Sequence, residues 1–473
     1  MNTKLLKQKI LDLAIRGKLT QQLKSDGTAL DLLKQISEQK RESSSTLSSP
    51  RRRGSSSAQS EKTIIPLDKN EAPFEIPANW EWVRLGDVCD DIFAGGDKPL
   101  VCTKEKTESN LIPVYANGIE NDGLYGFTNV ARVTKKAITI SARGTIGFSC
   151  VRELPFVPIV RLLTVIPFYH LVDLKYLKAV FDILLNVGEG SSIPQLTVPT
   201  IRIFVFPLPP LAEQQRIVEK IQEAFAEIDS IENNKELLKT HIKQARQKIL
   251  DLAIHGKLVL QNKADEPASV LLERITRDNP HYEKLTDVPF EIPDSWKWVK
   301  LGDVCKPIKR GKSPKYIEQS NILVFAQKCN QKDGPVSLEK ALYLDESTLN
   351  KYPKEEFLQK GDVIINSTGT GTLGRVGHFN VDLPQGIKGI VPDSHVTTIR
   401  SSVVNSNYLY SYLKNKQSYL EKNGEGSTNQ KELKPHTIYD LEFPLPPLAE
   451  QKRIVNKIEE IFASLDDISL HLV

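Results

Sequence analysis

The segment FPLPPLAEQQRIVEKI at residues 206–221 returns almost unchanged as FPLPPLAEQKRIVNKI at residues 443–458. The two copies are offset by 237 residues (443 − 206). In each copy an apolar strand leads into a segment with helical spacing. Self-similarity on this scale describes how the whole chain is organised, so we interpret it before any single motif.

Two further segments also occur twice. KQKILDLAIRGKL at residues 7–19 returns as RQKILDLAIHGKL at 246–258, and EIPANWEWVRLGDVC at 75–89 returns as EIPDSWKWVKLGDVC at 291–305. The order of the repeats is circular, because one copy of the helical region is intact in mid-chain and the other is divided between the two termini. This arrangement predicts a pseudo-two-fold molecule in which each half has a variable globular unit and a helical arm.

Bulk properties limit the class of protein. The net charge of the 473 residues is only +4, so nucleic-acid binding would have to come from local clusters of charge. We expect no signal peptide, because the N-terminal residues are Lys-rich and amphipathic, and no apolar run is long enough to cross a bilayer. The five cysteines lack CxxC spacing, which favours free thiols in a reducing compartment. We therefore expect a cytoplasmic protein without a membrane partner or a metal site.

The intact helical arm is the clearest structural prediction. Residues 211–253 contain no Pro or Gly, and apolar residues recur at 3-4 spacing over about four heptads, which gives a helix of roughly 65 Å. We expect the central arm to pair antiparallel with the C-terminal arm as a coiled coil, with the N-terminal helix completing the divided copy. The predicted seam and spacer residues are Ile221, Ile228, Ile231, Leu238, Ile242, Ile249, Ile454, Ile458, Ile461, Leu465 and Ile468.

The two globular units combine strands, turns and one helix each, which predicts a mixed α/β (α+β) fold. Short apolar runs such as LIPVYANG and NILVFAQ alternate with turns, and helices are expected at residues 174–185 and 408–419. The serine-rich stretch at 41–62 is absent from the other half and is interpreted as part of a flexible linker.

Catalytic and nucleotide-binding motifs are missing. The G-x-G-x-x-G formed by Gly369, Gly371 and Gly374 follows a predicted strand but is followed by a second strand instead of a helix, so we interpret it as a β-turn. There is no phosphate-binding P-loop, no H-E-x-x-H motif, no Cys/His cluster and no G-x-S-x-G motif.

Polar and basic residues gather in the predicted loops of both globular units. Lys and Arg can neutralise phosphates, and Arg, Asn and Gln can contact base edges, although loops are polar in most proteins. The candidate DNA-binding residues are Lys98, Asn117, Asn121, Arg132, Lys135, Arg143, Lys309, Arg310, Lys312, Gln327, Lys328, Asn330, Gln331 and Arg375.

The repeated FPLPPLAEQ segment, the W-x-W-V-x-L-G-D-V strand and the KILDLAI-x-GKL helix together resemble the specificity subunit of a Type I restriction–modification system. The resemblance covers nearly the whole chain except the serine-rich stretch. It implies a non-catalytic subunit whose two target recognition domains read the two halves of a split DNA sequence. The expected domains are an N-terminal helical segment (1–40), a linker (41–72), recognition domain 1 (73–206), a central helical region (207–278), recognition domain 2 (279–443) and a C-terminal helix (444–473).

The resemblance also implies partners and cofactors. The partners would be double-stranded DNA, two adenine methyltransferase subunits and restriction or translocase subunits. S-adenosylmethionine, ATP and magnesium would bind the partner subunits, and no cofactor would bind this chain. The Tyr-Ala-Asn-Gly turn at 115–118 is replaced by Phe-Ala-Gln-Lys at 325–328, so the two halves are expected to read different sequences. A DNA-binding regulator or a coiled-coil scaffold outside a restriction system stays open as an alternative.

Overall fold

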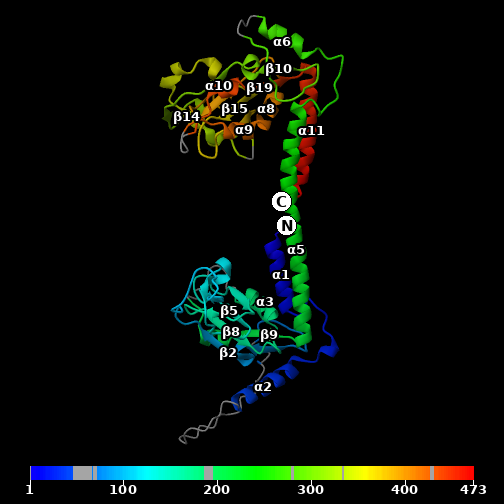
Figure 1. Ribbon diagram of the computed structural model, residues 1–473, viewed down its shortest axis with the longest axis vertical. Helices are drawn as coiled ribbons and strands as arrows, with labels where there is room; N and C mark the ends of the chain where they lie inside the picture. Colours follow the sequence, from blue (N-terminus) through cyan, green and yellow to red (C-terminus); the bar gives the residue numbers. More distant parts are fainter. Residues whose placement is uncertain are drawn as a thin grey trace. The chain divides into compact units, whose positions relative to one another are not determined.

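The chain forms two compact units in the computed structural model, Met1–Asn234 and Lys235–Val473. The structure describes residues 2–45, 67, 72–185, 195–277, 282–332, 335–426 and 431–472. The predicted central helix is present as α5 (Leu211–Ile254), whose first half belongs to unit 1 and whose second half belongs to unit 2 (Figure 1).

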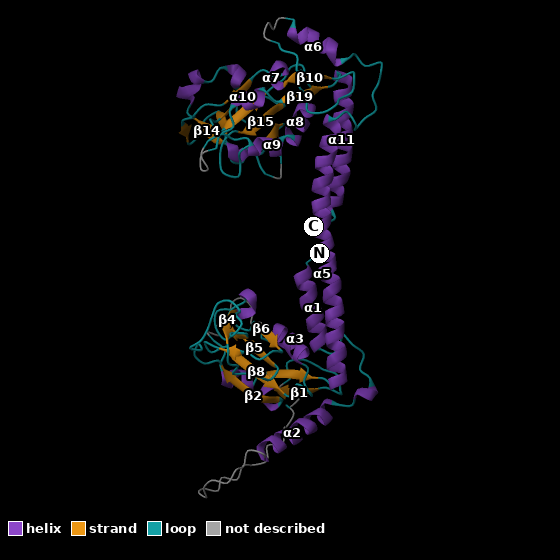
Figure 2. Cartoon of the chain, in the orientation of Figure 1, coloured by secondary structure: helices purple, strands orange, loops and turns teal. Residues whose placement is uncertain are grey.

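Unit 1 contains three small sheets beside a set of helices (Figure 2). Its sheets have the strand orders β2-β8-β5-β6, β4-β3-β7 and β1-β9. The strands are β1 (Glu81–Arg84), β2 (Cys89–Ala94), β3 (Ile112–Tyr115), β4 (Leu124–Thr128), β5 (Ala137–Ile140), β6 (Ser149–Arg152), β7 (Val157–Pro158), β8 (Leu163–Pro167) and β9 (Val205–Leu208). Besides α5, the helices are α1 (Thr3–Ile15), α2 (Ala29–Ser45), α3 (Leu174–Leu184) and α4 (Val198–Arg202).

Unit 2 is built on the same plan. Its sheets have the orders β11-β18-β15-β16, β12-β14-β13-β17 and β10-β19. The strands are β10 (Lys297–Lys300), β11 (Ile308–Arg310), β12 (Tyr316–Ile317), β13 (Ile322–Phe325), β14 (Leu342–Leu344), β15 (Asp362–Asn366), β16 (Val376–Phe379), β17 (Gly389–Pro392), β18 (Val396–Ile399) and β19 (Glu442–Leu445). The helices are α6 (Ala268–Thr276), α7 (Leu301–Val304), α8 (Ser406–Asn415), α9 (Gln417–Lys422), α10 (Pro435–Tyr439) and α11 (Leu448–Leu470). The mixed α/β fold class is confirmed, and the predicted helices at 174–185 and 408–419 correspond to α3 and to α8 with α9.

Each recognition domain leaves the helical arm and returns to it through one antiparallel strand pair. β1 pairs with β9, which places Trp82 opposite Pro207, and β10 pairs with β19, which places Trp298 opposite Pro444. The repeated Trp-rich and FPLP segments are therefore the two strands of one ladder. Phe206 in the first FPLP segment is fully buried, so the ladder belongs to the hydrophobic core of its unit.

The helical arms are antiparallel in both units, as the apolar spacing predicted. In unit 1, Lys7 near the start of α1 forms an ion pair with Asp229 of α5, whereas Gln22, beyond the end of α1, reaches Glu213 at the start of α5. α1 therefore runs against the first half of α5, and the two helices lie side by side in Figure 1.

In unit 2, α11 runs against the second half of α5 in the same way. Arg246 forms an ion pair with Asp466 (2.5 Å), and Gln261, later in the sequence, donates to Glu450, which comes before Asp466 (2.5 Å). The two segments therefore run in opposite directions. Among the predicted seam residues, Ile242 and Ile458 are buried at this contact.

The predicted seam is not buried throughout. The side chains of Ile231, Leu238 and Ile468 are 50%, 38% and 44% exposed, whereas that of Ile228 is only 3% exposed. The three exposed positions lie where the helix pairing ends. Ile231 is opposite only the first turn of α1, which begins at Thr3 opposite Glu232; α11 ends at Leu470 before it reaches the stretch of α5 around Leu238; and Ile468 is in the last turn of α11. The predicted linker also begins too early, since α2 continues to Ser45. The rest of the serine-rich stretch, residues 46–62, lies outside the described residues.

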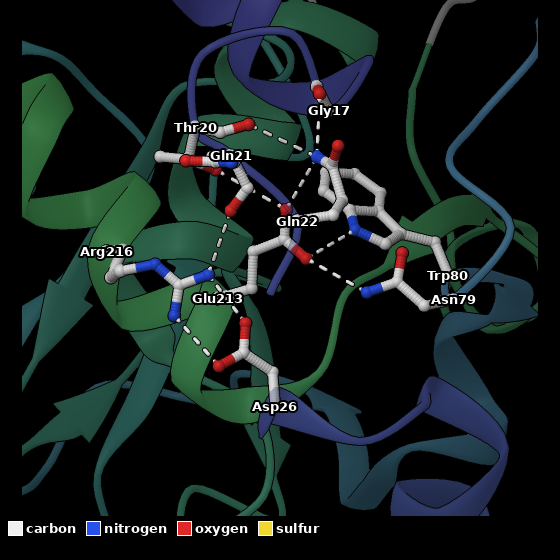
Figure 3. A network of polar contacts seen from close by, with 9 residues as sticks. All are labelled: Gly17, Thr20, Gln21, Gln22, Asp26, Asn79, Trp80, Glu213 and Arg216. Atoms are coloured by element: carbon white, nitrogen blue, oxygen red, sulfur yellow. Dashed lines mark hydrogen bonds and ion pairs between the residues drawn. The ribbon is translucent and has the colours of Figure 1, made fainter. Parts of the chain in front are cut away.

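A buried carboxylate joins the arm to the recognition domain in unit 1. Glu213, at the start of α5, is fully buried and accepts hydrogen bonds from the indole nitrogen of Trp80 (2.9 Å) and the amide of Gln22 (2.9 Å), as Figure 3 shows. One turn later, Arg216 forms an ion pair with Asp26 (2.6 Å). The Gln22 amide also donates to the carbonyl of Gly17 (2.9 Å), so the three repeated segments meet at this junction.

The same junction occurs in unit 2. Glu450, at the start of α11, accepts from the indole nitrogen of Trp296 (3.0 Å) and from Gln261 (2.5 Å). Arg453 pairs with Asp265 (2.6 Å). Burial raises the pKa of the Glu450 carboxyl, and the hydrogen bonds from Trp296 and Gln261 act in the opposite direction. The repeated sequence thus encodes a repeated polar contact that holds the arm to each domain.

Candidate nucleic-acid interface

Three loops gather at one edge of each recognition domain, and we call them the recognition loops. They follow β3, β5 and β7 in unit 1 (residues 116–123, 141–148 and 159–162), and β13, β15 and β17 in unit 2 (residues 326–332, 367–375 and 393–395). β3 is parallel to β7, and β13 is parallel to β17. Because the carboxyl ends of parallel strands meet at the same edge of a sheet, the first and third loops of each unit lie together.

In unit 2 a buried asparagine ties the first loop to the second. Asn330 is only 1% exposed, and its amide donates to the side-chain oxygen of Asn366 (3.1 Å) and to the carbonyl of Arg375 (3.0 Å). The Asn366 amide donates in turn to the carbonyl of Gln327 (3.2 Å), and the Thr372 hydroxyl donates to the Gln327 side chain (3.1 Å). Asn330 and Gln327, both predicted as DNA contacts, therefore use their side chains to fix the loops, and the buried Asn330 has no surface to offer a base.

The glycine-rich second loop is a hairpin loop, as predicted. It connects the antiparallel strands β15 and β16, and Gly369, Gly371 and Gly374 adopt φ values of +99°, +77° and +75°. Arg375 closes the loop, because its guanidinium donates to the carbonyls of Asn330 (2.9 Å) and Gly371 (3.1 Å). No helix opens after the last glycine, so the loop lacks the helix N-terminus that holds a dinucleotide pyrophosphate.

In unit 1 Asn117 performs the corresponding task for all three loops. Its side-chain oxygen accepts from the backbone nitrogen of Ala142 (2.8 Å), and its amide donates to the carbonyl of Val160 (2.8 Å). In the second loop, the Arg143 guanidinium donates twice to the Gln195 side chain (3.0 and 2.9 Å). Asn117 thus positions the three loops relative to one another, whereas the side chain of Arg143 is exposed on the surface of the second loop.

Several predicted basic residues are neutralised by carboxylates. Lys135 pairs with Asp90 (2.5 Å), and both Lys309 and Lys312 pair with Glu356. The two lysines lower the pKa of the Glu356 carboxyl against the opposing effect of burial, which is the largest single contribution. The ammonium group of a paired lysine must break its ion pair before it can bind a phosphate. We therefore expect these lysines to contribute less to DNA binding than unpaired basic residues.

Arg310 is engaged on both sides, by an ion pair with Glu432 and a hydrogen bond to the carbonyl of Ser394 in the third loop of unit 2. The remaining predicted residues are at least partly exposed and have no acidic partner among the described residues. They are Lys98, Asn121, Arg132, Arg143, Lys328, Gln331 and Arg375.

A basic cavity adjoins the second loop of unit 2. It has a volume of about 980 Å³ and is lined by Gly371, Arg375, helix α8, α11 and the second half of α5. Lys243 on α5 and Lys332 at the end of the first loop add positive charge to its wall. Lys243 was not predicted as a contact, because a lysine on the polar face of a helix is more often only solvated. The cavity shows that unit 2 presents arm and loop residues to a common space.

The comparisons with known proteins agree with this arrangement. A family model described as the Type I restriction modification DNA specificity domain matches residues 77–240 and again 293–470. The chain belongs to this family. Its role is therefore DNA recognition in a restriction–modification system, and the alternative of a regulator or scaffold outside such a system is not supported.

Similar full-length proteins extend the match beyond the recognition domains. The chain is 23% identical to the Type I restriction enzyme EcoEI specificity subunit of Escherichia coli, over 99% of this chain and 90% of that protein. It is 24% identical to the EcoAI specificity subunit of Escherichia coli, over 98% and 90% of the two chains. A chain from a solved structure, described as showing complex assembly and conformational transition of the type I R-M system, has the same fold (TM-score 0.53, 18% identity, 85% of this chain and 94% of that chain).

The described residues contain no group of three or more His, Cys, Asp or Glu side chains placed to hold a metal ion. No helix in that part of the chain has the length and apolar character needed to cross a membrane. Cys89 and Cys305 are buried in the cores, and burial raises the pKa of the Cys305 thiol to about 12, so these thiols pack as small apolar groups.

Proposed function

We propose that the chain reads a bipartite double-stranded DNA sequence, with one recognition domain for each half. The observation that carries this proposal is that the two units share the same strand pair and the same contact with the arm but differ in their recognition loops. Both units place a buried Trp–Glu contact at the arm, yet Asn117 braces the loops of unit 1 and Asn330 those of unit 2 by different bonds. Two domains that attach to the arm in the same way but have different loops are suited to recognising two different half-sites.

The proposal includes partner subunits. Two adenine methyltransferase subunits would bind S-adenosylmethionine and act at the recognised sequence, and restriction or translocase subunits would use ATP and magnesium. This chain would supply recognition and no catalysis. Exposed apolar residues on the unit 2 arm, Leu237, Leu238 and Leu470 (53%, 38% and 71% exposed), support the arm as a docking surface for a partner protein.

The central test is methylome sequencing of cells that express the chain with its methyltransferase subunits. A methylated, split sequence is the expected result, and the absence of any methylated motif would contradict the proposal. Exchanging residues 75–206 for the corresponding domain of a relative should change one half of the motif only. A change in both halves would show that the domains do not read independently.

A control tests the non-catalytic assignment. The purified chain is incubated with DNA, S-adenosylmethionine, ATP and magnesium, and methyl transfer and DNA cleavage are measured. We expect neither reaction until the partner subunits are added. Turnover by the homogeneous chain alone would overturn this part of the proposal.

A further inference from the structure

The third recognition loop of unit 1 has an unfavourable backbone conformation. Val160 and Arg161 have φ values of +51° and +59°, in the left-handed region that a β-branched residue such as valine rarely adopts. Val160 is 56% exposed, so packing of its side chain does not compensate for this conformation. Residues held in such conformations tend to occur where a site requires a particular geometry.

Three hydrogen bonds impose this conformation. The backbone nitrogens of Val160 and Arg161 donate to the carbonyls of Gly96 (2.9 Å) and Gly95 (3.1 Å), and Asn117 donates to the carbonyl of Val160 (2.8 Å). A side chain at Gly95 would lie 2.7 Å from the backbone of Pro158, so only glycine allows this close approach. The turn is thus fixed from the end of β2 and from the first loop.

The corresponding turn of unit 2 is held by other means. The backbone nitrogen of Gly311 donates to the carbonyl of Val396 (2.9 Å), just as that of Gly95 donates to the carbonyl of Leu162 in unit 1 (2.8 Å). Val396 therefore corresponds to Leu162, and the preceding residue, His395, corresponds to Arg161. Here the buried carboxylate of Asp393 accepts from the backbone nitrogen of His395 (2.8 Å).

The His395 side chain is exposed, and its Nδ1 lies 2.7 Å from the Thr368 hydroxyl of the second loop. In unit 1 the Arg161 side chain is likewise exposed, and its guanidinium makes no hydrogen bond or ion pair within the described part of the chain. Both units therefore fix the backbone of this turn and leave one polar side chain at the same place beside the other loops.

We propose that Arg161 and His395 are specificity-determining residues that contact base edges, one in each half of the DNA target. The inference rests on the proposed function. Arginine can donate two parallel hydrogen bonds to guanine, and histidine offers a single donor or acceptor, so the two positions would read different bases. A rigid turn favours base reading over phosphate binding, because discrimination between bases requires a fixed donor geometry.

The test uses the full chain in complex with its methyltransferase subunits and a duplex carrying the motif found by methylome sequencing. Each base pair of the motif is varied in turn, and relative binding is measured for the wild type, Arg161→Ala, Arg161→Lys and His395→Ala. Arg161→Ala should lower discrimination at one base pair by about 10- to 100-fold, in the half assigned to unit 1. Arg161→Lys should restore little of it, because lysine lacks the bidentate fork. His395→Ala should act only in the other half.

The other half-site is an internal control for folding and assembly, and thermal melting of each variant is compared with the wild type. A uniform loss of affinity for all duplexes, with a shallower salt dependence, would identify a phosphate contact and overturn the inference. Unchanged discrimination in Arg161→Ala would also overturn it. If the wild type itself prefers no sequence, the proposed function fails instead, so the two failures are distinguishable.

Discussion

The indole nitrogen of Trp80 donates to the buried carboxylate of Glu213 across 2.9 Å, although the two residues are 133 positions apart in the sequence. Trp80 lies near the start of recognition domain 1, just before β1, and Glu213 lies in the first turn of the arm helix α5. Their bond therefore links the start of the domain to the first turn of the arm helix, and the equivalent pair in unit 2 does the same.

Removing this carboxylate should destabilise unit 1. Glu213→Ala leaves the buried indole N–H of Trp80 without its acceptor, which should lower the free energy of unfolding by about 1–3 kcal/mol. Denaturant unfolding followed by tryptophan fluorescence measures the change. Glu213→Gln retains one acceptor oxygen and should cost less, and Glu450→Ala is the matched variant in unit 2. Wild-type stability of Glu213→Ala would show that the bond contributes nothing.

The buried asparagine of unit 2 should matter more for stability than its exposed neighbour. Asn330→Ala removes the donor to Asn366 and Arg375 inside the loops, which should cost about 1–3 kcal/mol and weaken base discrimination in one half-site. Gln331→Ala changes an exposed side chain and should leave the melting temperature unchanged. Equal melting temperatures for the two variants would contradict the bracing role of Asn330.

The burial difference along α5 provides a paired test of helix packing. Ile228→Asp places a charge where the side chain is 3% exposed and should cost several kcal/mol, whereas Ile231→Asp, at a position 50% exposed, should cost less than about 0.5 kcal/mol. Thermal melting and methylation by the assembled complex are the measurements. Similar losses for both variants would mean that α1 does not cover Ile228.

An insertion in α5 tests whether this helix sets the gap between half-sites. Four residues added after Lys235 lengthen the helix by about 6 Å and add a rotation of about 40°. Base pairs are spaced about 3.4 Å apart, so the gap should widen by one or two base pairs while the bases read at each end stay the same. Methylome sequencing with an unaltered gap and full activity would exclude the helix as the determinant.

The sequence predicted the elements that depend on local periodicity. The unbroken spacing of apolar residues identified α5 and its antiparallel partners, and the glycine pattern ending at Gly374 was correctly interpreted as a turn between strands. The exposure of Ile231 and Leu238 could not be predicted, because the spacing of residues on one helix does not report where its partner helix ends.

The conformation of the recognition loops was only partly predictable. Asn330 and Lys328 are both polar residues in one turn. Nothing in the sequence around them indicates that Asn330 is buried and fixes the loops whereas Lys328 is exposed. The turn at Val160 and Arg161 carried no glycine or asparagine to signal a left-handed backbone, so its apolar neighbours resembled continuous strand. Those features arise from contacts between distant segments, such as Asn117 with Val160, which local pattern does not contain.

The β1–β9 and β10–β19 ladders have a consequence for how such genes can change. Each recognition domain is inserted into the arm through a two-stranded stem, with Arg84 opposite Val205 in one unit and Lys300 opposite Glu442 in the other. Genetic exchange within the two short coding stretches for a stem would replace everything between them and leave the arm intact. Because the two stems are similar in amino-acid sequence, a domain exchanged in this way would enter a stem of the same kind in either half of the chain.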